Sequence, residues 1–261
     1  MKYEFNNKEH LHLLDGKPLT GTSSVGNVLA KNLVWWSAEL SAVECLEIGE
    51  KIPTIREEYE TACKSSDKKK AIDALQKKYP IFKKARFAHF DKKNKTAKEG
   101  TDLHAELERY VKHVMKTGDD TGPLDMAKQI IPFVEWTQKN VKKFIASEAH
   151  CFDEELWVGG ITDCVAELND GKLAIIDFKS AKEVYTNHLI QASGYAIQIE
   201  KNGLFSEDGE HSKKLEGKIE ALIVVPFGAE IIIPEVKYDV EAYKQGFRNC
   251  VGLYRLLGMD K

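Results

Sequence analysis

Two acids and a lysine near the middle of the chain have the types and spacing that metal-assisted chemistry requires. Asp177 and Lys179 occupy alternate positions of an apolar segment, residues 173–179, which has the composition of a buried strand. Alternation places both side chains on one face of that strand and Phe178 on the other. For a bare Asp-x-Lys triplet, a structural ion pair is the commoner interpretation. Whether this triplet is catalytic therefore depends on the residues around it.

A third candidate, Asp163, lies on the preceding strand-like segment, residues 158–168. Asn169-Asp170-Gly171, between the two strands, is a turn signal. If these three residues form the loop, Asp163 lies directly opposite Asp177, whereas a two-residue loop would send the two carboxylates to opposite faces. Two facing carboxylates stay ionised together only with a cation between them.

Oxygen ligands of this kind indicate one or two Mg²⁺ or Mn²⁺ ions. Such an ion polarises a phosphodiester and lowers the pKa of a bound water. Lys179 would then orient the attacking water or balance the charge that develops on the substrate.

The elements that must position these residues follow from the periodicity of the sequence. A helix is expected from Gly100-Thr101, with Thr101 as N-cap, to Gly118, and a second over 124–145 that Pro132 bends. After the two strands we expect a helix over 185–200, strands over 219–225 and 230–238, and a helix over 241–257. This order predicts an α/β protein with a mixed sheet flanked by helices.

The N-terminal part precedes this core. Residues 1–20 have the pattern of a short hairpin or arm, Thr22-Ser23-Ser24 could cap a helix through Leu33, and residues 38–98 look like several helices. No linker separates them from the rest. We therefore expect an N-terminal arm and basic helical portion at 1–98 and a core at 99–261, in one continuous structural unit.

Further candidates lie on the helices. His104 stands beside the apolar stripe of its helix and can face the sheet, although a packed core histidine is the commoner case. Gln191 and Tyr195 are four residues apart and share a helical face with His188. Glu108, four residues after His104, is either an outer partner of that histidine or a solvated acid.

Five motifs in order between residues 100 and 200 resemble the PD-(D/E)XK nuclease superfamily, and most of all its RecB-type branch. They are Gly100-Thr101-Asp102-Leu103-His104, Glu148 on the strand before the hairpin, Gly160-Ile161-Thr162-Asp163, Asp177-Phe178-Lys179 and the Gln191-to-Tyr195 helix. The resemblance implies a restriction-endonuclease-like core carrying an N-terminal helical portion.

It also implies roles. Asp163 and Asp177 correspond to the metal-binding acids, His104 to an additional metal ligand, and Glu148 to an acid near the metals; Phe178 is included in the metal site. Lys179 corresponds to the catalytic lysine, and Gln191 and Tyr195 to residues that position the substrate and the lysine. Some members of the branch bind an iron–sulfur cluster through four cysteines. The five cysteines here are far apart, with no Cys-x-x-Cys pair, so we expect no cluster and a phage-type exonuclease.

The charge of the chain is concentrated in one segment. Between Lys64 and Lys98, thirteen Lys and Arg oppose three Asp, a balance of +10, although the whole chain carries a net charge of −3. Four aromatic residues are interleaved. Such a stretch is typical either of a surface that follows a phosphate backbone and stacks bases or of a solvated lysine-rich hairpin. Lys83, Lys84 and Arg86 are the candidate DNA contacts.

Composition excludes other classes. The chain of 261 residues is 43% hydrophobic and 30% charged, as in ordinary soluble proteins. No apolar run approaches the roughly 20 residues that cross a bilayer, and the start lacks the apolar stretch of a secretion signal. We expect a cytoplasmic setting, in a bacterial or phage-infected cell, and no membrane partner.

These observations predict a Mg²⁺- or Mn²⁺-dependent deoxyribonuclease, an exonuclease that acts on single-stranded DNA or DNA ends. A helicase or recombination protein is a candidate partner. Two alternatives stay open: a catalytically silent DNA-binding module on the same fold, and a structure-selective endonuclease.

Overall fold

The computed structural model describes residues 2–29, 37, 41, 52–206, 211–227, 231 and 234–259, with the side chains of 52–53, 81–82, 86, 89–101, 211–212 and 235 left out. The chain divides into two compact units. Residues 1–30 and 99–261 form the first, and residues 31–98 form the second. Residues 1–30, expected from the sequence to belong with the basic helical portion, lie in the same compact unit as residues 99–261. The reason is that β4 (Thr20–Gly21) pairs in parallel with a strand of the main sheet.

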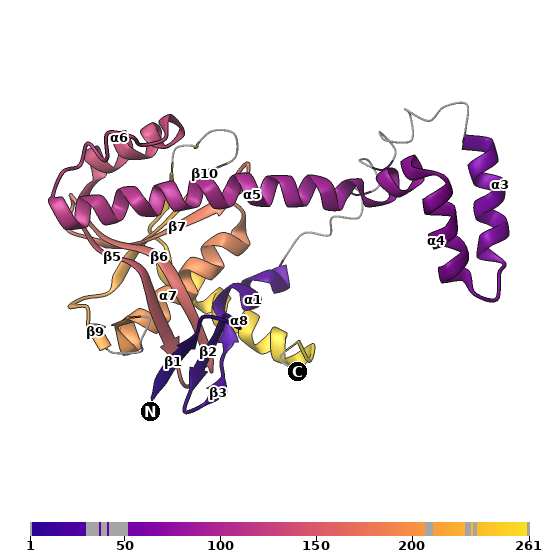
Figure 1. Ribbon diagram of the computed structural model, residues 1–261. Helices are drawn as coiled ribbons and strands as arrows, with labels where there is room; N and C mark the ends of the chain where they lie inside the picture. Colours follow the sequence, from indigo (N-terminus) through magenta and orange to yellow (C-terminus); the bar gives the residue numbers. More distant parts are fainter. Residues whose placement is uncertain are drawn as a thin grey trace. The chain divides into compact units, whose positions relative to one another are not determined.

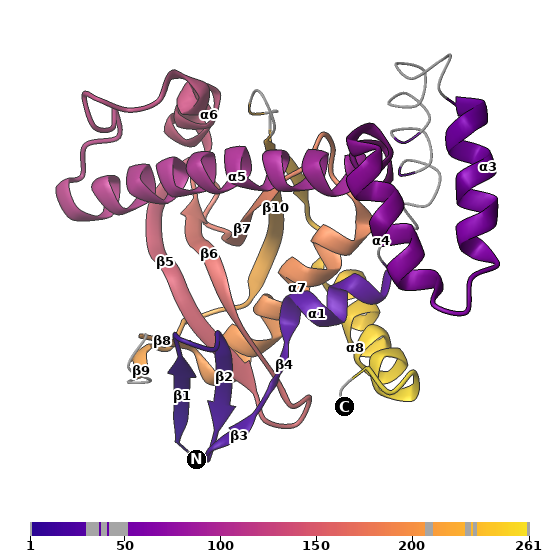
Figure 2. The same ribbon diagram turned by 45° about the vertical axis from the view of Figure 1, so that its right-hand side comes forward.

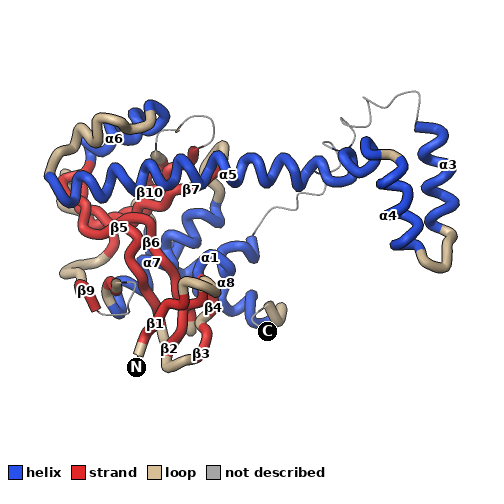
Figure 3. Tube along the Cα trace, viewed as in Figure 1, coloured by secondary structure: helices blue, strands red, loops and turns tan. Residues whose placement is uncertain are grey.

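The first unit is built on a mixed sheet with the strand order β11-β10-β7-β6-β5-β8-β9, and β4 lies beside β6. Figures 1 and 3 show its central strands β10, β7, β6 and β5. Strands β5, β6 and β7 are antiparallel neighbours, and β10 runs parallel to β7. The α/β class with a mixed sheet, predicted from the order of elements, is confirmed. The strands are β5 (Val141–Asp153), β6 (Val158–Leu168), β7 (Leu173–Ser180), β8 (Leu204–Phe205), β9 (His211–Lys213), β10 (Ile219–Phe227) and β11 (Glu235–Lys237).

Helices cover both faces of this sheet (Figure 2). On one face, α5 (Pro80–Thr117) and α6 (Ile131–Asn140) bury the apolar residues at even positions of β7, such as Ile176. On the other, α7 (Thr186–Asn202) and α8 (Val240–Leu256) bury odd positions, such as Ile175. A strand with both faces buried must be apolar at nearly every position, which explains the composition of β7.

The N-terminal arm is a small three-stranded sheet, β1 (Tyr3–Asn6), β2 (Leu11–Leu14) and β3 (Lys17–Pro18). The Tyr3 hydroxyl is hydrogen-bonded to Nδ1 of His12 at 2.6 Å and to Nδ1 of His150 on β5 at 3.1 Å. The arm continues through β4 into α1 (Thr22–Gly26) and the 3-10 turn η1 (Asn27–Leu29). No side chain caps α1, and the rest of the helix expected through Leu33 lies outside the described residues.

In the second unit, α3 (Ile52–Cys63) and α4 (Lys68–Lys78) precede the first part of α5. The Asp67 carboxylate caps α4 by accepting a hydrogen bond from the Lys70 amide at 3.1 Å. The two helices pack through buried apolar residues and are linked by an ion pair of 2.7 Å between Lys78 and Glu58.

Two helix boundaries differ from the predicted ones. Helix α5 begins at Pro80 rather than near Thr101, because Pro80 suits a first helical turn and a single internal Gly100 costs only about 1 kcal/mol. Pro132 lies at the start of α6 instead of bending a longer helix, and β5 already begins at Val141. The 3-10 turn η3 (Lys128–Ile130) directly precedes α6. Within the described part of the chain, no helix has the length and apolar character needed to span a membrane.

Candidate metal centre

The β6–β7 hairpin has the three-residue loop on which the sequence argument depended. The Leu168 amide donates to the Lys172 carbonyl at 2.9 Å, and Gly171 closes the turn with a φ of 85°. A positive φ is the conformation that a glycine adopts most readily. The last residues paired in the ladder are Cys164 and Ile176. The candidate acids Asp163 and Asp177 are the residues directly beyond this pair.

Asp163 lies where the β6–β7 ladder opens. Its Oδ2 accepts a hydrogen bond of 2.6 Å from the backbone amide of Phe178, which fixes the orientation of the carboxylate. The Phe178 side chain points away into the core beneath α5 and α6. Phe178 was predicted to belong to the metal site, and its observed contribution is this amide.

His104 reaches the same carboxylate from α5. Its Nε2 lies 3.4 Å from Asp163 Oδ1, and its ring packs edge-on against Phe178 with 5.6 Å between the ring centres. The hydrogen bond with Asp163 raises the pKa of His104 and outweighs burial; the charges of Asp163, Glu148 and Glu108 act in the same direction. A histidine surrounded by acids in this way is well placed to receive a cation.

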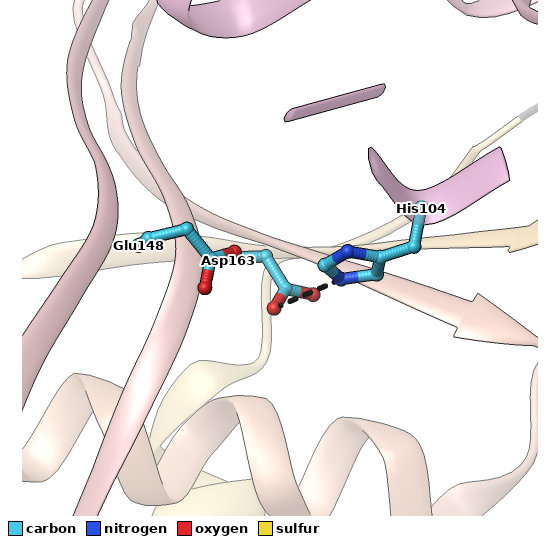
Figure 4. Close-up of side chains that lie close together, drawn as sticks. All are labelled: His104, Glu148 and Asp163. Carbon is cyan, nitrogen blue, oxygen red and sulfur yellow. Dashed lines mark ion pairs between the residues drawn. The ribbon is translucent and has the colours of Figure 1, made fainter. Parts of the chain in front are cut away.

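Glu148 completes a three-residue cluster from β5. The nitrogen and oxygen atoms that His104, Glu148 and Asp163 offer all lie within 4.8 Å of one another, and Figure 4 shows the three side chains converging from three elements. The Glu148 backbone is left-handed, with a φ of 50°, between two residues that pair normally with β6. This conformation, rare for a residue other than glycine, turns the side chain out of the strand pattern.

One carboxylate oxygen of Glu148 lacks a partner among the residues that the structure describes. None of these residues forms a hydrogen bond with the buried Glu148 Oε1. Burial, followed by the charges of Asp163 and Glu108, raises the pKa of Glu148 to about 7. A buried carboxylate oxygen without a partner is costly unless a ligand supplies one.

Asp177 is paired with Lys179 beside this cluster. Lys179 Nζ donates to Asp177 Oδ1 at 2.9 Å and lies 2.8 Å from Oδ2. Burial raises the pKa of Asp177 to about 7, Lys179 opposes the shift, and Asp163 adds to it. Burial lowers the pKa of Lys179, but Asp177 and Asp163 outweigh it, so that the net shift is upward and the ammonium stays charged. Asp177 is thus engaged by the lysine rather than being a member of the three-residue cluster.

The residues present fit a divalent cation. They offer several carboxylate oxygens and one imidazole nitrogen, and the buried Glu148 Oε1 has no hydrogen-bond partner in the described part of the chain. Carboxylates favour Mg²⁺ or Mn²⁺, and the imidazole favours Mn²⁺ of the two. His104, Glu148 and Asp163 would hold the ion, with Asp177 adjacent.

The α7 residues lie at the edge of the same region. Gln191 Nε2 donates to the Tyr195 hydroxyl at 2.7 Å. Tyr195 is buried, and burial followed by the charges of Asp177 and Asp163 raises its pKa. A Cβ at Gly160 would lie 2.6 Å from Tyr195 Cε1, so this glycine lets the ring approach β6.

Two further polar residues of the first unit carry no functional signal in the sequence. Thr22, interpreted only as a helix cap, donates to the Gly159 carbonyl and accepts from Gln198. His188, noted only for its helical face, has its pKa lowered to about 4 by burial and by Lys179. No sequence motif marks Thr22, because its partners lie more than a hundred residues away.

The predicted DNA contacts belong to the second unit. Lys83 and Lys84 are exposed on the first part of α5, and the Arg86 side chain lies outside the described ones. No protein-family model matches this chain, and a comparison with curated proteins also finds no match. Its function must therefore be inferred from its own residues.

Proposed function

We propose that this protein is a metal-dependent DNA nuclease with a restriction-endonuclease-like PD-(D/E)XK core of the RecB type. The observation that carries the proposal is the convergence of His104, Glu148 and Asp163 beside the Asp177–Lys179 pair. An ion pair without chemistry would not need a second and a third acid nearby, which repel it and one another.

The chain's own residues would divide the work as follows. A bound Mg²⁺ or Mn²⁺ would polarise the phosphodiester and lower the pKa of a bound water. Asp163, held by the Phe178 amide, and His104 keep the ligand atoms in place. Lys179, held 2.9 Å from Asp177, directs its charge at the attacking water or at the phosphate oxygens.

Gln191 and Tyr195 would then orient the substrate. Their hydrogen bond fixes the phenol near the acids, where the raised pKa of Tyr195 keeps the hydroxyl protonated as a donor. A rigid donor beside a metal centre favours one position of the substrate over others.

The substrate we propose is single-stranded DNA or a DNA end. The second unit supports this proposal, because its basic segment with interleaved aromatic residues suits a flexible strand whose bases can stack. The cytoplasmic setting and a helicase or recombination partner stay predictions. A silent DNA-binding module is disfavoured by the complete set of Asp163, Asp177 and Lys179.

The test is cleavage of labelled DNA. Linear single strands, duplexes and a covalently closed single-stranded circle are incubated with Mg²⁺, Mn²⁺ or EDTA. We expect metal-dependent release of nucleotides from the linear strand and none from the circle. Rapid cutting of the circle would make the protein an endonuclease with the same metal chemistry.

A variant pair controls for contamination and for fold. Asp163→Asn removes the charge at the centre, and Asp170→Asn removes an exposed acid from the loop of the same hairpin. Cleavage and Mn²⁺ binding, measured by calorimetry, should be lost only in Asp163→Asn. Equal activity and equal Mn²⁺ affinity in the two variants would overturn the proposed centre.

A further inference from the structure

A second cavity lies where the N-terminal arm meets β6. It has a volume of about 250 Å³ and is lined by residues of the first unit only. The arm contributes His10, His12, Ser23 and Ser24, among others, while the core contributes the β6 residues 159–161 and Tyr195. None of these residues belongs to the cluster of His104, Glu148 and Asp163.

The wall of this cavity along β6 is closely packed backbone. A Cβ at Gly159 would lie 2.9 Å from the Cβ of His12, and one at Gly160 would lie 2.8 Å from Thr22 Oγ1. Thr22 is held from two sides, since it donates to the Gly159 carbonyl at 3.0 Å and accepts from Gln198 at 2.7 Å. The hollow is therefore shaped by fixed residues.

The lining carries no permanently charged side chain. No Lys, Arg, Asp or Glu is among the described residues that line it. Burial lowers the pKa of His12 to about 3, and His150 and His10 act in the same direction, so this imidazole is neutral at pH 7. A phosphate would lack a cationic partner here, whereas a neutral heteroaromatic ring could pack against flat side chains and bond to the serine hydroxyls.

Tyr195 connects the cavity to the metal centre. Its ring lines the cavity, and its hydroxyl accepts from Gln191 and is influenced by the charges of Asp177 and Asp163. Along β6, Gly160 of the cavity and Asp163 of the centre are three residues apart, which is roughly 10 Å of strand. A strand cut at the metal centre would thus place a neighbouring nucleotide at the cavity.

We infer that this cavity binds one nucleobase of the DNA strand whose backbone lies at the metal centre. This inference rests on the proposed nuclease function. It adds a subsite that binds a base and takes no part in the chemical step. It gives the N-terminal arm a part in substrate binding.

The test is binding of short single-stranded DNA in EDTA, followed by fluorescence anisotropy. Oligonucleotides carry a single abasic site, moved one position at a time from either end. We expect one position at which loss of the base weakens binding about tenfold, the scale of a single stacked base. A terminal phosphate, added or removed, should change the affinity less than about twofold, because the cavity offers it no cation.

Filling the cavity provides the matched comparison. Ser24→Trp introduces a large ring into the cavity from a half-buried position of its lining. If this variant does not fold, Ser23→Trp introduces the same ring from an exposed position. Gly252→Trp adds the same ring on α8, where nothing lies within 4 Å. The filled variants should lose about tenfold in affinity for the intact strand and all sensitivity to the abasic position, and the control should keep both.

The outcomes separate the two proposals. Uniform binding at all abasic positions, unchanged binding by a folded filled variant, or an affinity governed by the terminal phosphate would each overturn the base subsite, even if Mn²⁺-dependent cleavage is normal. Base-dependent binding without cleavage in either metal would keep the subsite and remove the nuclease. No binding to DNA at all would overturn both.

Discussion

Lys179 has little freedom, because both oxygens of Asp177 lie within 2.9 Å of its ammonium group. We predict that Lys179→Ala reduces DNA cleavage at least about a hundredfold, the scale for losing a charge-stabilising group. Mn²⁺ affinity should change far less, because the lysine is no ligand. The comparison is Lys182→Ala, an exposed lysine just beyond β7, which should cut at the normal rate. Cleavage that survives in Lys179→Ala would exclude the proposed role.

The acids of the centre predict an unusual pH dependence. The pKa values of Glu148 and Asp177 are raised to about 7 from ordinary values of 4.5 and 3.8. Because the folded state then holds these protons more tightly than the unfolded chain, the metal-free protein is most stable below about pH 4 as far as these two groups are concerned. It loses that contribution as the pH rises through 7. Mn²⁺ competes with the same protons, so its affinity should rise over the same range.

Denaturant titrations of the metal-free protein at pH 5.5 and pH 8 measure this effect. Glu148→Gln cannot ionise and should be more stable than the wild type at pH 8, with a smaller difference between the two pH values. Wild-type stability that increases from pH 5.5 to pH 8, with no change in Glu148→Gln, would show that these carboxyls are ionised without cost.

At the scale of elements, the β6–β7 hairpin sets the register of the centre. Gly171 has a φ of 85°, which an alanine adopts only at a cost of about 1–2 kcal/mol. Gly252, exposed on α8 with nothing within 4 Å, should respond in the opposite way, because alanine favours a helix by about 1 kcal/mol. We predict that Gly171→Ala lowers the free energy of unfolding and that Gly252→Ala raises it. Shifts of the same sign would contradict this account of the turn.

The elements that could be predicted from sequence are those whose pattern is local. The bounds of β6 match the predicted ones, and β7 and α7 differ by one or two residues, since alternation and helical spacing are both clear there. The predicted start of α5 near Thr101 was wrong because Gly100 was interpreted as a helix boundary, whereas the helix continues through it from Pro80. The predicted helix over 124–145 was wrong at both ends because Pro132 is as compatible with beginning a helix as with bending one, and β5 already starts at Val141.

The residues of the candidate site likewise fall into those with a local sequence pattern and those without one. The sequence left the loop between Asp163 and Asp177 open at two or three residues, and the observed ladder ends at Cys164 and Ile176, one residue before the two acids. His104 was expected to face the sheet, and its Nε2 lies 3.4 Å from Asp163 Oδ1. The left-handed backbone at Glu148 and the contacts of Thr22 depend on strands distant in the sequence, so no local pattern contains them. These distant contacts are also why residues 1–30 lie in the same compact unit as the core.

At the scale of the whole molecule, charge is distributed unevenly between the two units. We predict that replacing Lys83, Lys84 and Arg86 by Glu weakens binding to single-stranded DNA and flattens its dependence on salt, because fewer counterions are released. The control replaces three exposed lysines of the first unit by Glu, namely Lys213, Lys214 and Lys218. Equal slopes of log affinity against log salt in wild type and both variants would make the Lys64–Lys98 segment a plain solvated surface.

The N-terminal arm is synthesised well before the residues that it contacts. Tyr3 bonds to a residue 147 positions further on, and Thr22 to one 176 positions further on. At roughly 5–20 residues per second, the arm leaves the ribosome about 10–35 s before its last partner is made. Folding of the first unit must therefore wait for most of the chain, and pairings so distant in sequence are slow to form. In the proposed nuclease, the cavity that we infer to bind a base would form only after Gln198 has been synthesised.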